Sequence, residues 1–119
     1  MVTKRNLVQA IIEKVENNYD DVEIRTNMVE GYKRPEKIIF KGNQEKGFIP
    51  DVLFRSEKST DLYEIELDQD YKLEKWRLFS LYSTQKKGDF NIVTPEANLH
   101  QLRKLLTEHQ INARIFYFS

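Results

Sequence analysis

The sequence predicts one α/β domain in which a mixed β-sheet lies between layers of helices. Three observations lead to this expectation. Helical apolar spacing occurs near the beginning, in the middle and late in the chain, and β-type patterns occupy the segments between. The elements follow the order α-β-β-β-β-α-β-α-β, which favours a three-layer arrangement with helices on both faces of the sheet. The length of 119 residues suits a single domain spanning residues 1–119.

The first helix is expected at residues 6–18, because apolar side chains recur there at spacings of three and four. Thr3 is a suitable N-cap for it. Residues 22–27 then alternate apolar and polar side chains, which predicts a half-buried strand. After a loop, the β-prone run at residues 38–40 could pair with that strand.

The next two predicted strands form a hairpin. Residues 47–55 give the first, in which Pro50 belongs at an edge, at a bulge or at the strand start, because proline has no N–H to donate. Residues 62–68 give the second, after a polar turn. A helix is expected at residues 71–86, with Asp70 as its cap.

The end of the chain predicts two further crossovers. Residues 90–93 read as a short buried strand, and Thr94 and Pro95 form a typical helix start before a leucine-rich apolar face. Residues 111–118 predict the last strand. Strands that alternate with helices in this way are expected to pair in parallel.

The strand at residues 62–68 carries a row of carboxylates on one face. Glu64, Glu66 and Asp68 point one way, and apolar or aromatic side chains alternate with them. Such a row is either a solvated face of an outer strand or a metal site. Residues 57–74 hold seven acids and two bases, whereas the rest of the chain has more bases than acids. This distribution fits a metal-dependent enzyme acting on a polyanion, and it also fits an uneven surface.

Composition excludes several other classes of site. The chain has no cysteine, so disulfides, thiolate metal sites and thiol nucleophiles are excluded. Only His100 and His109 are present, which excludes a multi-histidine zinc cluster. No apolar run approaches the roughly 20 residues that span a bilayer. We therefore expect a cytoplasmic protein without a membrane partner.

Asp51 begins the strand that neighbours Glu64 in the predicted hairpin. In a plausible register the two carboxylates lie side by side. Carboxylates that converge at a strand end suit Mg²⁺ or Mn²⁺, which prefer hard oxygen ligands. Such an ion can orient a phosphodiester and stabilise the leaving oxygen.

These residues resemble a known motif. Pro50-Asp51, a spacer and then Glu64-Ile65-Glu66 on a hydrophobic strand are similar to the PD-(D/E)XK nuclease superfamily. This is the restriction-endonuclease-like fold shared by Holliday-junction resolvases, and the similarity in element order extends over most of the chain. The resemblance implies a Mg²⁺- or Mn²⁺-dependent nuclease with Asp51 and Glu64 as metal ligands. DNA is the expected substrate, and RNA is the alternative.

Glu66 is the main departure from the family, because it stands where the motif has its lysine. A carboxylate there could be a third metal ligand, with the lysine supplied from elsewhere. Lys75 is the better candidate, since it shares a helix side with apolar residues, and Lys72 lies near the start of the same helix. The family often adds an acid from the first helix, a position that Glu16 matches best.

Two alternatives stay open at this point. The carboxylates could simply face water, or the chain could be a catalytically inactive nuclease-fold module that binds nucleic acid or a protein. For an active enzyme of this size we expect a homodimer that presents two sites to two strands.

Overall fold

The computed structural model describes residues 2–119, apart from the side chains of residues 43–45. The helices are α1 (Lys4–Asn18), α2 (Leu73–Gln85) and α3 (Leu99–Glu108), with a short 3₁₀ helix η1 (Glu96–Asn98) before α3. The strands are β1 (Glu23–Thr26), β2 (Ile38–Phe40), β3 (Asn43–Phe48), β4 (Val52–Arg55), β5 (Thr60–Ile65), β6 (Phe90–Pro95) and β7 (Arg114–Phe118). Among the residues described, no helix is both long and apolar enough to cross a bilayer.

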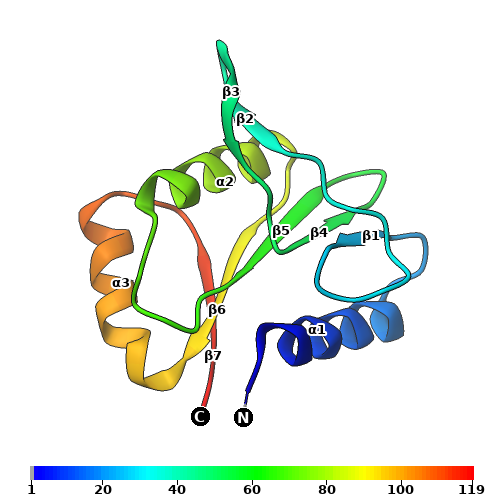
Figure 1. Cartoon of the computed structure of the whole chain (residues 1–119), viewed down its shortest axis with the longest axis horizontal. Helices are drawn as coiled ribbons and strands as arrows, with labels where there is room; N and C mark the ends of the chain where they lie inside the picture. Colours follow the sequence, from blue (N-terminus) through cyan, green and yellow to red (C-terminus); the bar gives the residue numbers. More distant parts are fainter. Residues whose placement is uncertain (1) are drawn as a thin grey trace.

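A mixed sheet of five strands forms the centre of the fold. Its order is β1-β4-β5-β6-β7, so β5 is the middle strand. The pairs β1–β4 and β4–β5 are antiparallel, whereas β5–β6 and β6–β7 are parallel, as the alternation of strands and helices predicted. Strands β2 and β3 form a separate antiparallel pair that projects from the body of the molecule (Figure 1).

Helices cover both faces of the sheet, which confirms the predicted layers. Figure 1 shows α2 and α3 on one side and α1 on the other. The core under α2 and α3 includes Leu53, Leu62, Trp76, Phe79, Ile92 and Leu102. The core under α1 consists of Val8, Ile12, Val52, Phe54, Ile65 and Val93. Residues that alternate along β4 and β5 therefore contribute to opposite cores, as the two-residue period of a strand requires.

Thr3 caps helix α1 as the sequence predicted, although the helix begins at Lys4 and not at the expected residue 6. The Thr3 Oγ1 atom accepts a hydrogen bond from the Asn6 N–H at 3.1 Å, which caps the first turn. Val8 and Ile12 are the fully buried side chains of this helix. Their spacing of four residues places them on one face, and that face lies against the sheet.

The predicted element order is one strand short. The single strand expected at residues 47–55 is divided, because β3 ends at Phe48 and β4 begins at Val52. Pro50 lies in the break, where it has no N–H to contribute to a ladder. The expected pairing of residues 22–27 with residues 38–40 is also wrong, since β1 pairs with β4 and β2 pairs with β3.

Two predicted helix starts also differ from the structure. Helix α2 begins at Leu73 with Lys72 as its N-cap residue and without a side-chain cap, so Asp70 does not cap it. Thr94 and Pro95 belong to β6, and the helical turn begins at Glu96 as η1. Thr94 is fully buried in the sheet, and the ladder with β7 continues through Pro95. Tertiary strand pairing has outweighed the local capping signal.

Candidate active site

The hairpin of β4 and β5 brings Asp51 beside Glu64. Val52 pairs with Tyr63 in the antiparallel register. Asp51, which precedes Val52, therefore lies beside Glu64, which follows Tyr63. The Asp51 N–H donates to Glu64 Oε1 at 2.9 Å, and the Ile65 N–H donates to Asp51 Oδ2 at 2.8 Å. The two carboxylates therefore accept the backbone N–H groups at the end of the hairpin.

All three predicted carboxylates are buried. Asp51 is 7% exposed, Glu64 is 1% exposed and Glu66 is 8% exposed. Glu64 alternates with Tyr63 and Ile65, so it faces the α2 side of the sheet, as does Leu62. The alternative that the row of acids is a solvated strand face is thereby excluded for Glu64 and Glu66, whereas Asp68 is exposed. A buried carboxylate needs cations or donors to offset its lost hydration.

Two lysines from different helices supply those cations. Lys75 on α2 places its Nζ 2.8 Å from Glu64 Oε2 and 3.6 Å from Glu66 Oε1. Lys4 on α1 places its Nζ 3.5 Å from Asp51 Oδ2. Three carboxylates thus face two ammonium groups, and the cluster is one positive charge short of neutrality.

Burial, more than the charge balance, changes the proton affinity of the cluster. Burial, and then the charge of Asp51, raises the pKa of Glu64 from 4.5 to about 7, against the opposing effect of Lys75. Burial also raises the pKa of Glu66, which Lys75 and Lys4 oppose. Burial lowers the pKa of Lys75, but the charge and hydrogen bond of Glu64, together with the charges of Glu66 and Asp51, outweigh it, and the pKa is raised. Lys75 therefore stays charged while Glu64 titrates near neutral pH.

An aromatic pair borders the cluster at Glu66. The rings of Tyr71 and Trp76 lie 5.0 Å apart, and both polar atoms of this pair are buried without a hydrogen-bond partner among the described residues. The Trp76 N–H lies outside hydrogen-bond geometry, yet its approach lowers the pKa of Glu66. Burial, and then the charge of Glu66, raises the pKa of Tyr71.

Two predicted site residues lie apart from this cluster. Lys72 is exposed at the N-cap of α2 and makes none of the ion pairs found among the described residues. Glu16 is exposed on α1 and accepts a hydrogen bond from the Tyr32 hydroxyl at 3.3 Å. In the part of the chain that is described, no hydrogen bond or ion pair joins Glu16 to the three carboxylates.

Lys4 is the residue that sequence reasoning missed. It occupies the first position of α1, four residues before the buried Val8, and so shares the face that packs on the hairpin. The spacing of four residues between Lys4 and Val8 is the signal in the sequence that places this lysine on the packed face of α1.

The carboxylate oxygens of the cluster are suitable ligands for a hard cation, but several of them are already engaged within the protein. Carboxylate oxygens are what Mg²⁺ prefers, and a divalent ion would supply the missing positive charge. Glu64 and Asp51, however, already accept backbone N–H groups, and Lys75 occupies the other Glu64 oxygen. Within residues 2–119, excluding the undescribed side chains, no three His, Asp or Glu side chains are grouped so as to hold a metal ion.

Comparison of the chain with protein-family models, with curated proteins and with solved structures finds no match.

Proposed function

We propose that this protein is a metal-dependent nuclease of restriction-endonuclease-like fold that hydrolyses phosphodiester bonds in DNA. The observation that carries the proposal is the position of Lys75, whose Nζ lies 2.8 Å from Glu64 Oε2. In the motif the lysine follows on the same strand as this glutamate, at the position that Glu66 occupies here. An ammonium group supplied from α2 restores the combination of two acids and a lysine that the motif requires. The parallel arrangement of β5 and β6 and the coverage by α2 are compatible with that fold.

In this proposal Asp51, Glu64 and Glu66 hold Mg²⁺ or Mn²⁺, which when bound supplies Lewis-acid chemistry to the phosphate. Binding would require Lys75 to leave Glu64 Oε2. Its ammonium group would then be free to offset charge on the substrate or to hold the attacking water. Burial and the negative charge of Asp51 raise the pKa of Glu64 to about 7, so at neutral pH proton loss from this carboxyl would accompany cation binding.

DNA is the proposed substrate because of the charge distribution. Outside residues 57–74 the chain carries 17 basic and 12 acidic residues, so the acidic segment lies within a chain that is otherwise mildly basic. Basic side chains can hold a nucleic-acid backbone while a bound cation shields the carboxylates from the phosphates. A homodimer would present two such sites to the two strands of a duplex.

The test is cleavage of supercoiled DNA with Mg²⁺ or Mn²⁺ by the wild-type chain and by Asp51→Asn, Glu64→Gln and Lys75→Met. The first two substitutions keep an acceptor for the backbone N–H groups that these carboxylates bind. Each variant is expected to lose cleavage by about a hundredfold or more. Asp68→Asn and Lys58→Met, which remove exposed charges of the same kinds, are the matched controls and should cleave normally.

Undiminished cleavage by the Asp51→Asn, Glu64→Gln double variant would contradict the assignment of these carboxylates to a nuclease site. The same conclusion follows if chelation of divalent ions leaves cleavage unchanged.

A second candidate function is a non-catalytic module that binds nucleic acid or a protein. It is favoured by the engagement of Lys75 with Glu64 and by the absence, among the described residues, of a grouping able to hold a metal. Titration calorimetry with Mn²⁺ separates the two candidates. Binding that is lost in Glu64→Gln supports the nuclease, whereas the lack of binding to the wild-type chain supports the module.

A further inference from the structure

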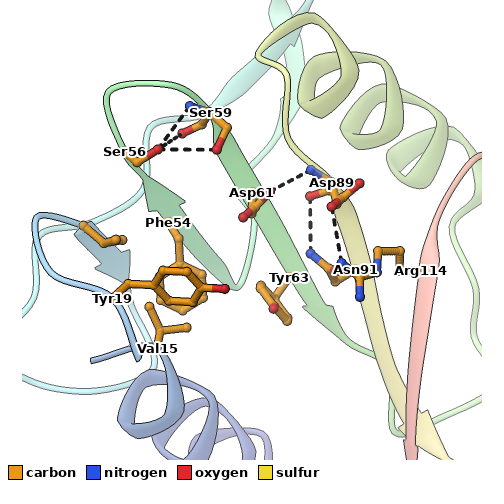
Figure 2. Close-up of a pocket in the computed structure, with 11 residues that line it drawn as sticks. Val15, Tyr19, Phe54, Ser56, Ser59, Asp61, Tyr63, Asp89, Asn91 and Arg114 are labelled. Carbon is orange, nitrogen blue, oxygen red and sulfur yellow. Dashed lines mark hydrogen bonds and ion pairs between the residues drawn. The ribbon is translucent and has the colours of Figure 1, made fainter. Parts of the chain in front are cut away.

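A pocket of about 290 Å³ lies on the α1 side of the sheet, on the face of β5 opposite to Glu64. Its walls come from the end of α1, from β4 and β5, and from the first residues of β6 and β7 (Figure 2). The residues that give it its character are Tyr19, Phe54, Asp61, Tyr63, Asn91 and Arg114, and we call it the Tyr63 pocket. It shares no residue with the carboxylate site.

Aromatic rings form one side of the Tyr63 pocket. Tyr63 packs edge-on against Phe54 at a centroid distance of 5.4 Å and stacks with Phe116 at 6.3 Å, so its ring is held in place. Tyr19 stands at the end of α1 with 65% of its surface exposed. Figure 2 shows its hydroxyl pointing across the pocket towards Tyr63. Fixed aromatic faces beside an open space suit a planar or cationic group.

Hydrogen-bond acceptors form the other side. Asp61 Oδ1 accepts the Asp89 N–H at 2.7 Å, which fixes the carboxylate, and Asp61 makes no ion pair with any described residue. Asn91 is only 2% exposed and donates its amide NH₂ to the carbonyls of Leu62 and Asp89, at 3.2 Å and 3.3 Å. None of the described residues donates to Asn91 Oδ1. The groups of the pocket that remain able to accept hydrogen bonds from a ligand are therefore a carboxylate oxygen of Asp61 and the side-chain carbonyl oxygen of Asn91.

At the rim of the pocket, the guanidinium group of Arg114 lies between a carboxylate and an aromatic ring. The Arg114 guanidinium lies 3.4 Å from Asp89 Oδ2 and 5.4 Å from the centre of the Phe116 ring. It neutralises Asp89 and leaves Asp61 without a cation. Burial, and then the charge of Asp61, raises the pKa of the Tyr63 hydroxyl, against the opposing effect of the Arg114 charge.

We propose that the Tyr63 pocket binds a guanidinium group, carried either by an arginine side chain of a partner protein or by a free small molecule. A guanidinium is planar, is always charged and presents five N–H donors, so it can stack on the tyrosines while it donates to Asp61 and Asn91. A phosphate or carboxylate would be repelled by Asp61. This binding site does not depend on the proposed nuclease activity.

The test is a titration of the ¹⁵N-labelled full chain with N-acetyl-arginine methylamide, followed by two-dimensional NMR. Saturable shifts are expected at the amides of Asp61 and Tyr63 and at the side-chain NH₂ of Asn91. The citrulline analogue has the same shape without the charge, and it should bind about tenfold more weakly or worse. The lack of saturable shifts with the arginine probe, or equal binding of citrulline, would overturn the proposal.

Variants locate the binding within the pocket. Asp61→Asn keeps the acceptor for the Asp89 N–H and should weaken binding about tenfold, because it removes the unpaired charge. Tyr19→Ala should weaken binding about threefold through the loss of an exposed cation–π contact. Asp68→Asn removes an exposed acid elsewhere and should bind like the wild type. Unchanged binding in Asp61→Asn contradicts the site.

A final comparison separates the two sources of the group. Free L-arginine and an arginine within a short neutral peptide are titrated side by side. Tighter binding of the peptide assigns the pocket to a protein partner, and tighter binding of the free amino acid assigns it to a small molecule. Either result supports the guanidinium site.

Discussion

Glu64 is the residue on which the carboxylate site depends. Its Oε1 accepts the Asp51 N–H and its Oε2 pairs with Lys75, so one side chain connects the β4–β5 hairpin to α2. The alternating pattern around it correctly predicted that Glu64 and Glu66 share a face. The catalytic role of both residues stays a prediction.

The raised pKa of Glu64 predicts how stability changes with pH. Burial and the charge of Asp51 raise the value from 4.5 to about 7, so the folded protein holds one proton more than the unfolded chain between these two pH values. The free energy of unfolding of the wild type should therefore fall as pH rises through this window.

Glu64→Gln removes this titration and keeps an acceptor for Asp51. Its free energy of unfolding should therefore fall less between pH 5 and pH 8 than that of the wild type. Urea denaturation at both pH values measures the difference. Parallel losses in the two proteins would show that Glu64 does not titrate in this way.

At the scale of elements, the connection from α2 to β6 holds α2 over the face of the sheet that carries Glu64. The Thr60 N–H donates to the Lys86 carbonyl at 3.2 Å, and the Gly88 N–H donates to the Ser83 carbonyl at 2.8 Å. The start of β5 and the end of α2 are thus tied together. This contact holds α2, and with it Lys75, over the central strand.

Two neighbouring substitutions in that connection should have different effects. A Cβ at position 88 would collide with the Thr60 carbonyl, so Gly88→Ala should lower the free energy of unfolding by about 2 kcal/mol or more. Lys87 has a φ of 62°, in the left-handed region that favours glycine. Lys87→Gly should therefore change stability by less than about 1 kcal/mol. Thermal unfolding of both variants tests the pair, and an equal loss in both would contradict the predicted collision.

At the scale of the whole molecule, one sheet separates two cores that share its strands. Leu53 and Leu62 belong to the core under α2 and α3, whereas Val52 and Ile65 belong to the core under α1. Because neighbouring residues of β4 and β5 enter opposite cores, loss of packing on one face should destabilise the other. The domain is expected to unfold cooperatively.

Ile12→Ala tests this coupling, since Ile12 is 3% exposed under α1 and Trp76 reports from the opposite core. The substitution should lower the free energy of unfolding by about 2–4 kcal/mol, and Trp76 fluorescence should follow the same transition as far-ultraviolet circular dichroism. Leu81→Ala, at an exposed site on α2, is the control and should cost less than about 0.5 kcal/mol. Two separate transitions in Ile12→Ala would show that the cores unfold independently.

The sequence by itself determined the properties that depend on local periodicity. The face of α1 that carries Val8 and Ile12, the shared face of Glu64 and Glu66, the α/β layers and the parallel crossovers all follow from spacings of two or of three to four residues. The choice of Lys75 over Lys72 also came from helical spacing, and Lys75 is the one that reaches the carboxylates.

Only the tertiary structure decided which elements meet. Segments far apart in the chain meet in the pairing of β1 with β4, in the approach of Lys4 to Asp51 and in the pocket beside Tyr63. The structure also located the break at Pro50 between β3 and β4. Side-chain direction is set by the local backbone, whereas partners are set by the packing of whole elements against one another. A pattern along the chain can therefore show that Glu64 and Glu66 share a face without showing whether that face is buried or which cations neutralise it.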